Sequence, residues 1–242
     1  MLNFVLIHGS WHTGEHWAPV INYLRSKGHT AVAPTLLGHG RGVERRVSHA
    51  QQVQDLMSQI ERENWRDFVA VGHSYGGTII ARLAEEIPDR IRRLVFWNAF
   101  VPERGHSLYD ELPPYLRSLF DQLAVAAGDG SVMLPYAIWR DAFINDAEES
   151  LAKSAYESLS PEPYQPHLDK LDLARFYKTR IPKSYLNCTE DNALPQGAEW
   201  GWHPRMSQRL GLFRLLQMPG SHEVIFTNPA GLAAKLIEAG RD

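Results

Sequence analysis

The chain has 242 residues, a length that a single α/β domain can fill, since such domains run to about 250 residues. Apolar residues make up 44% and charged residues 22%, a balance that excludes a disordered or fibrous chain. The 25 Lys and Arg against 28 Asp and Glu give a net charge of −3, so the basic excess of a nucleic-acid-binding protein is missing. We therefore expect one globular domain, with or without an insertion, and no nucleic-acid partner.

The chemistry available to the chain is limited by its single cysteine, Cys188, which excludes an intrachain disulfide and a thiolate metal site. No apolar stretch approaches the roughly 20 residues of a membrane span. The chain begins with residues 1–3 (MLN), without the basic region of a signal peptide. We expect no membrane partner, no metal, no cofactor and a cytoplasmic location. Catalysis would then depend on Ser, His, Asp and Glu side chains.

Short apolar runs alternate with segments of helical apolar spacing along the chain. Strands are predicted at residues 4–7, 31–33, 68–71, 94–97, 184–187 and 213–218. Helices are predicted at residues 17–27, 48–63, from the glycines at 76 and 77 to about 87, 204–210 and 229–238, the last with Asn228 as its N-cap. The regular alternation up to residue 97 indicates right-handed crossovers and a parallel sheet of about six strands with helices on both faces.

Residues 102–179 interrupt this alternation. They contain no comparable strand run, and prolines separate segments of helical pattern. The sequence therefore predicts an α/β core formed by residues 1–101 and 180–242, with residues 102–179 inserted as a helical cap. Exposed helices of such a cap are compatible with a homodimer.

The strongest local signal is the G-x-S-x-G pattern at residues 72–76 (GHSYG), which lies between an apolar strand and an apolar-faced helix. The tight turn requires the glycines, strains the Ser74 backbone and holds its Oγ at the carboxyl edge of the sheet. The helix start also presents the positive end of its dipole to a developing oxyanion. A structural glycine-rich turn is the alternative, but the context favours Ser74 as a nucleophile.

A serine nucleophile needs a general base and a carboxylate that orients the base. In the usual chain order, the acid follows a late strand and the histidine follows the last strand. Asp191 follows the predicted strand that ends near residue 188, and His222 follows the last predicted strand. Glu190 competes for the role of acid, but the chain order and the shorter side chain favour Asp191. We predict a triad of Ser74, His222 and Asp191.

Two backbone N–H groups form the oxyanion hole of such a site, one from the residue after the nucleophile and one from the loop after the first strand. These are Tyr75 and Ser10, although an ordinary strand-ending loop is the alternative for residues 8–12. The cap aromatics are expected to form mostly the core of the cap, with some facing an apolar pocket. The candidates for that pocket are Trp11, His12, Phe100 and Trp139.

The segments 4–12, 72–77 and 95–102, with Asp191 and His222, resemble the α/β-hydrolase superfamily over nearly the whole chain. The resemblance is greatest to its branch of plant methyl esterases, hydroxynitrile lyases and bacterial EstC-type esterases. It implies an α/β-hydrolase fold with a helical cap, and a Ser–His–Asp mechanism that uses the residues predicted above.

Hydroxynitrile lyases of this branch have a lysine directly after the catalytic histidine, whereas this chain has Glu223 there. This difference argues against cyanogenic lyase activity. The predicted function is hydrolysis of a small apolar or aromatic carboxylic ester through an acyl-enzyme. Two alternatives stay open: a lyase or other cofactor-free reaction in which Ser74 and His222 relay protons, and a small-molecule receptor with slow hydrolysis.

Overall fold

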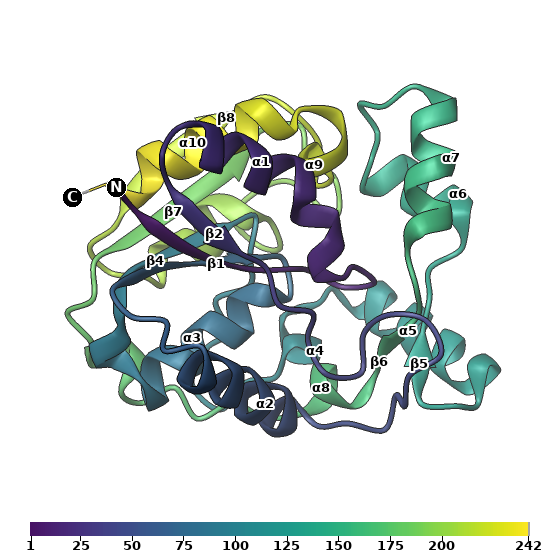
Figure 1. Ribbon diagram of the computed structural model, residues 1–242. Helices are drawn as coiled ribbons and strands as arrows, with labels where there is room; N and C mark the ends of the chain where they lie inside the picture. Colours follow the sequence, from purple (N-terminus) through teal and green to yellow (C-terminus); the bar gives the residue numbers. More distant parts are fainter. Residues whose placement is uncertain (242) are drawn as a thin grey trace.

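The computed structural model describes residues 1–241 and places a six-stranded parallel sheet at the centre of the molecule (Figure 1). The strands are β1 (Asn3–Ile7), β2 (Thr30–Val32), β3 (Phe68–His73), β4 (Ile91–Trp97), β7 (Lys183–Cys188) and β8 (Arg214–Met218). Their order is β2-β1-β3-β4-β7-β8, and every pairing between them is parallel. The predicted sheet is thus confirmed, with strand ends that shift by one to three residues.

Helices cover both faces of this sheet. Figure 1 shows α1 (Ala18–Ser26) and α10 (Pro229–Gly240) on one face, and α2 (His49–Arg62) and α3 (Gly76–Glu86) on the other. The apolar core divides in the same way, because alternate residues of a strand point to opposite faces. In β3, Val69 and Val71 pack with α1 and α10, whereas Phe68 and Ala70 pack with α2 and α3.

Two helix starts are capped by side chains, and the cap by Asn228 was predicted. The Ser48 side chain accepts a hydrogen bond from the N–H of Gln51 at the start of α2, and the Asn228 side chain does the same for Gly231 at the start of α10. The helix predicted at residues 204–210 is shifted, since the helical turn η4 spans Trp202–Met206. Shorter turns are η1 (Gly14–Trp17), η2 (Pro88–Arg90), η3 (Phe176–Lys178) and α9 (Val224–Thr227).

The segment between β4 and β7 forms a cap at one end of the sheet (Figure 1). Its helices are α4 (Leu108–Glu111), α5 (Pro114–Ala127), α6 (Tyr136–Ala142), α7 (Glu149–Ser158) and α8 (Gln165–Leu168). The cap also contains an antiparallel pair, β5 (Ser131–Val132) with β6 (Glu162–Pro163), which was not predicted because two-residue strands carry no periodic pattern. Within residues 1–241, no helix combines the length and the apolar character needed to cross a membrane.

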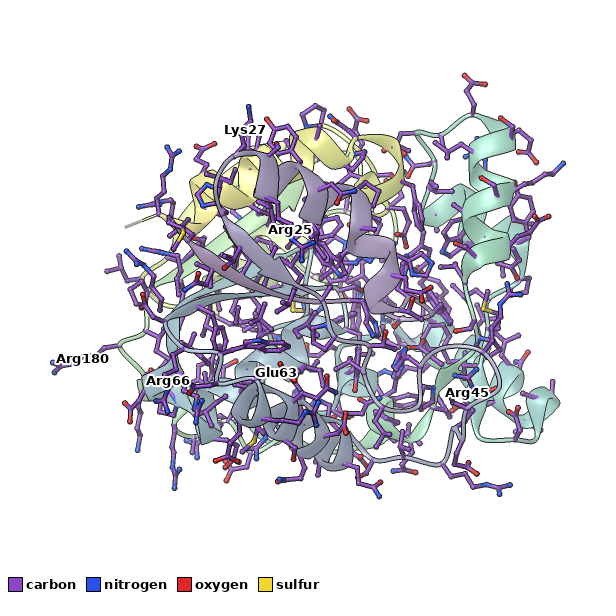
Figure 2. The ribbon with its side chains drawn as sticks, in the orientation of Figure 1. Arg25, Lys27, Arg45, Glu63, Arg66 and Arg180 are labelled. Carbon is purple, nitrogen blue, oxygen red and sulfur yellow. The ribbon has the colours of Figure 1, made fainter. Side chains whose placement is uncertain are left out.

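Charged side chains of the core mostly project outwards, as Arg66 and Arg180 do in Figure 2. Arg45 is an exception, because it is buried and its guanidinium donates to the carbonyls of Gly38 and Gly40. This arginine holds the long loop between β2 and α2 in a compact form beside the cap.

The turn from β3 into α3 leaves no space for side chains at its glycines. A Cβ on Gly76 would lie 2.7 Å from the carbonyl oxygen of Ile7 and 2.8 Å from that of His8. The turn therefore packs backbone against backbone with the end of β1. This close approach brings the loop after β1 next to the turn that carries Ser74.

Replacing Gly76 by Ala should destabilise the protein by about 3 kcal/mol or more, because the rigid backbone of β1 cannot give way to the methyl group. Gly28→Ala is the matched control, since Gly28 has φ +80° but open space around it. Its cost should be only about 1 to 2 kcal/mol, from the left-handed backbone alone. Urea unfolding of both variants measures the difference, and equal unfolding midpoints would contradict the proposed packing.

Candidate active site

Ser74 lies at the end of β3 in a strained backbone conformation, with a φ of 52°. Its N–H donates to the carbonyl of Trp97 (3.2 Å), and its own carbonyl accepts from the N–H groups of Gly77 and Phe100 (both 3.1 Å). The side chain lines a cavity, and its Oγ has no hydrogen-bonding partner among residues 1–241. Catalytic hydrogen bonds in ligand-free sites are often long and tighten when a substrate binds. The Ser74 hydroxyl is therefore held in place by its backbone and free to act on a ligand.

His222 lies in the loop after β8 and contacts Asp191 directly. Its Nδ1 donates to Asp191 Oδ2 over 2.6 Å, and both side chains are buried. Because a carboxylate oxygen only accepts, the proton of the neutral imidazole lies on Nδ1 and the lone pair lies on Nε2. This is the tautomer that a general base requires.

Only one of the two candidate acids reaches the histidine. Asp191 is fully buried, and its second oxygen, Oδ1, accepts from the N–H of Ala193 (2.8 Å). Glu190 is exposed and contributes only backbone hydrogen bonds, one of them from its N–H to the carbonyl of Gly220 (3.1 Å). The geometry therefore assigns the imidazole contact to Asp191.

Asn98 is a site residue that sequence reasoning missed. It follows β4 with a φ of 35°, donates from Nδ2 to Asp191 Oδ2, and accepts at Oδ1 from the N–H of Cys188 (2.6 Å). The amide thus ties the end of β4 to the end of β7 and holds the carboxylate. The sequence did contain a signal for this residue, because Asn98 is a polar side chain directly after a buried strand.

Aromatic rings hold the His222 imidazole on several sides. Trp202 stacks on it (centroids 5.2 Å apart, 19°), and Phe143 of the cap meets it edge-on (5.2 Å, 88°). His73 lies 4.6 Å away and donates from Nε2 to the carbonyl of His222 (3.1 Å). Burial keeps the pKa of His73 well below its ordinary value, so this ring is a neutral, fixed donor. Core and cap together orient the His222 ring.

The loop after β1 is held by histidines. His8 Nδ1 donates to the carbonyl of Gly9 (2.8 Å), and its Nε2 accepts from the N–H of Leu36 (3.0 Å). Burial lowers the pKa of His8 to about 3, which keeps this ring neutral as well. Trp11, in the same loop, has a φ of 64°. Among residues 1–241, no group of three His, Cys, Asp or Glu side chains is arranged to hold a metal ion.

Two backbone N–H groups next to Ser74 remain free. Neither Ser10 nor Tyr75 donates its N–H to a protein acceptor among residues 1–241. The loop that carries Ser10 lies against Ser74, because a Cβ on Gly9 would lie 3.0 Å from Ser74 Cβ. Free donors at this position can stabilise an oxyanion.

The cavity beside Ser74 is narrow and apolar, with a volume of about 130 Å³. It is lined mainly by side chains of the cap, and its polar members include Ser10, Ser74, His167, Asn192 and the exposed Tyr115. Trp11 and Phe100 line it, as two of the four pocket candidates. The other two are not among its lining residues: His12 is buried beside Glu223, and Trp139 is fully buried against Tyr156 in the cap.

His12 and Glu223 form a buried ion pair that sequence reasoning did not foresee. His12 Nδ1 donates to the carbonyl of Ser10 (2.6 Å), and its Nε2 lies 3.0 Å from Glu223 Oε2. Burial by itself lowers the pKa of His12, but the charge and hydrogen bonding of Glu223 outweigh it and raise the pKa above 6.5. The pair therefore links the loop that carries Ser10 to the residue after His222.

This ion pair predicts a pH-dependent contribution to stability. Because the folded state raises the His12 pKa, the contribution is complete below about pH 6.5 and is lost as the pH rises through the raised pKa. Glu223→Gln should lower the free energy of unfolding by on the order of 2 kcal/mol near pH 6, with a smaller difference at pH 9.

Urea unfolding across this pH range measures the difference. Glu190→Gln is the control, and removal of its exposed carboxylate should change stability by less than about 0.5 kcal/mol at every pH. A loss in Glu223→Gln that is the same at pH 6 and pH 9 would contradict a charged pair.

Comparison with known proteins gives a consistent result. The chain matches the model of the alpha/beta hydrolase family over residues 4–235. A solved extracellular alpha/beta-hydrolase from a Paenibacillus species, described as sharing structural and functional homology with tobacco salicylic acid binding protein 2, is 41% identical. The alignment covers 100% of both chains with a TM-score of 0.97.

Two further relatives have names that state an activity or a ligand. A carbendazim hydrolyzing esterase from Nocardioides sp. (strain SG-4G) is 41% identical over 119 residues, 48% of this chain and 49% of that protein. Salicylic acid-binding protein 2 from Nicotiana tabacum is 25% identical over 98% of this chain and 96% of its own length. Esterase relatives of this kind support hydrolysis of esters as the general activity. With this fold and a family match along nearly its whole length, the chain belongs to the alpha/beta hydrolase family.

Proposed function

We propose that this protein hydrolyses carboxylic esters through an acyl-enzyme formed on Ser74. The observation that carries the proposal is the buried Asp191–His222 pair behind a serine with a strained backbone and a free hydroxyl. The free N–H groups of Ser10 and Tyr75 support it, because acyl transfer develops negative charge on the carbonyl oxygen. The esterase relatives support the same class of reaction.

In the acylation step, Ser74 Oγ attacks the ester carbonyl while His222 Nε2 takes the hydroxyl proton. The carbonyl electrons move to its oxygen, which the N–H groups of Ser10 and Tyr75 stabilise together with the N-terminal end of α3. Collapse of this intermediate breaks the bond to the leaving alkoxide, which receives the proton from His222. Asp191 stabilises the transient imidazolium and keeps the ring in its tautomer.

Deacylation repeats the same chemistry with water. His222 takes a proton from the water as the water attacks the acyl carbonyl. The second tetrahedral intermediate then expels Ser74 Oγ, which receives this proton from His222, and the acid is released. The cavity supports a small apolar or aromatic substrate, since an apolar cavity of about 150 Å³ binds benzene and this one has about 130 Å³. One aromatic ring is therefore the size of group that we propose for it.

Glu223 favours hydrolysis over the lyase alternative. The hydroxynitrile lyases that this chain resembles have a lysine directly after the catalytic histidine, whereas Glu223 stands there in this chain and is buried against His12. The cytoplasmic location stays a prediction, and the Paenibacillus relative is described as extracellular. The sequence left a homodimer open without predicting it.

Ser74→Ala should lower kcat on a short p-nitrophenyl ester by about 10⁴-fold or more, because the nucleophile is lost. The fold should be unchanged, since alanine removes only one atom, and circular dichroism with thermal unfolding provides that control. Activity close to wild type in a correctly folded Ser74→Ala protein would overturn the acyl-enzyme mechanism.

The choice between the two acids gives a separate test. Asp191→Asn should lower kcat by about 10³- to 10⁴-fold, because an amide in place of the carboxylate favours the wrong imidazole tautomer. Glu190→Gln, one residue away and exposed, should keep at least about half of the wild-type activity. Steady-state kinetics on the same ester measures both, and the reverse pattern would make Glu190 the acid.

A further inference from the structure

One buried polar side chain in the cavity is not used by the proposed mechanism. His167 of α8 is about 1% exposed and lines the same cavity as Ser74. Of the other polar lining residues, Ser10 and Ser74 belong to the reaction, and Asn192 is exposed. Trp11 and Trp202 also line the cavity, but their indole N–H groups only donate, and that of Trp11 already donates to the carbonyl of Val132. His167 is therefore the buried lining side chain, beyond the reacting atoms, that can accept a hydrogen bond from a ligand.

The His167 ring is held in one orientation. It stacks on the ring of Tyr75 (centroids 5.4 Å apart, 18°), the residue directly after the nucleophile. Phe120 packs on it from the cap with a centroid distance of 6.0 Å. This position brings the imidazole beside the cavity on the Tyr75 side of Ser74.

Glu162 of β6 lies on the other side of His167 and is also buried. The two side chains approach to 3.0 Å between Nε2 and Oε2, both at most 2% exposed. In the neutral form of the ring, this carboxylate favours the proton on the nearer nitrogen, Nε2, because a carboxylate oxygen repels a lone pair. The other nitrogen, Nδ1, is then a hydrogen-bond acceptor.

Both ring nitrogens of His167 are buried, and neither makes a hydrogen bond within residues 1–241: Nε2 lies close to Glu162 without hydrogen-bond geometry, and Nδ1 has no such neighbour. Buried polar atoms without partners reduce stability, and such an atom in a native structure calls for an explanation. A ligand that enters the cavity can supply the missing partner. An acceptor nitrogen selects a ligand group that donates, such as a hydroxyl or N–H.

We propose that His167 is a specificity-determining residue that accepts a hydrogen bond from a hydroxyl or N–H group on the part of the ester bound in the cavity. The inference rests on the proposed ester hydrolysis and narrows its substrate class to esters that carry a second, donating polar group. Glu162 acts through His167 as a positioning residue, because it sets which nitrogen can accept.

Substrates that differ only in this group test the proposal. The probes are ethyl 3-phenylpropanoate and its 3-hydroxy, 4-hydroxy, 3-methoxy and 4-methoxy ring derivatives, since methoxy groups accept hydrogen bonds but cannot donate. For wild type, kcat/KM for at least one hydroxy ester should exceed that for the matching methoxy ester by about 10-fold. Because both kcat/KM values are measured on the same protein, their ratio does not depend on the fraction of that protein that is folded.

His167→Phe keeps an aromatic ring but removes both nitrogens, so this ratio should fall to about 1. Glu162→Gln should lower the hydroxy preference too, because its amide can donate to Nε2 and shift the imidazole proton to Nδ1. Asn192→Ala, at another polar lining residue, is the control and should keep the ratio.

The same preference can be measured as binding to the Ser74→Ala protein. Calorimetry gives the dissociation constants of 3-phenylpropanoate and of its hydroxy and methoxy derivatives. This arm separates the two proposals, because a failure of hydrolysis would leave the binding preference measurable. A wild-type ratio near 1 for every pair, or a hydroxy preference that survives in His167→Phe, would overturn the role of His167.

Discussion

The buried carboxylate of Asp191 is the constraint on which the site depends. A carboxylate removed from water is costly unless donors surround it, and this one receives hydrogen bonds from His222, Asn98 and the N–H of Ala193. The three donors follow three different strands of the sheet, β8, β4 and β7. The buried charge is therefore tolerated only when these strands lie in the observed parallel register. The geometry of the site thus depends directly on the topology of the sheet.

The histidines around the site hold different protonation states because their surroundings differ. His8 and His73 are buried without a carboxylate, and burial keeps their pKa values low and their rings neutral. His12 is equally buried, but Glu223 raises its pKa and favours the charged form. His222 faces the carboxylate of Asp191. His8 and His73 are therefore neutral hydrogen-bond donors, the charged form of His12 is favoured, and His222 is the proposed base.

The cap does more than cover the sheet. Its apolar residues belong to the same continuous core as α2 and α3, so the cap packs as part of the domain. Phe143 contacts the ring of His222, and its carbonyl accepts from the N–H of Glu223 (3.1 Å). The cap therefore contributes to orienting the His222 ring as well as to the shape of the cavity.

The sequence by itself determined the order of the core strands and helices, the turn that carries Ser74, and the positions of His222 and the two candidate acids after the last strands. These features have local signals: apolar runs of strand length, glycines that a tight turn requires, and polar residues directly after a strand. The family could be predicted for the same reason, because its patterns are short and lie at strand ends.

Only the tertiary structure decided which side chains meet. Asn98 and Asp191 are 93 residues apart, and neither the His12–Glu223 pair nor the His167–Glu162 pair has a signal in the sequence around it. The prediction that His12 and Trp139 line the pocket was wrong, because residue type does not reveal which way a loop or cap side chain points. Contacts between distant segments depend on how the cap packs on the sheet, and that packing is a property of the whole chain.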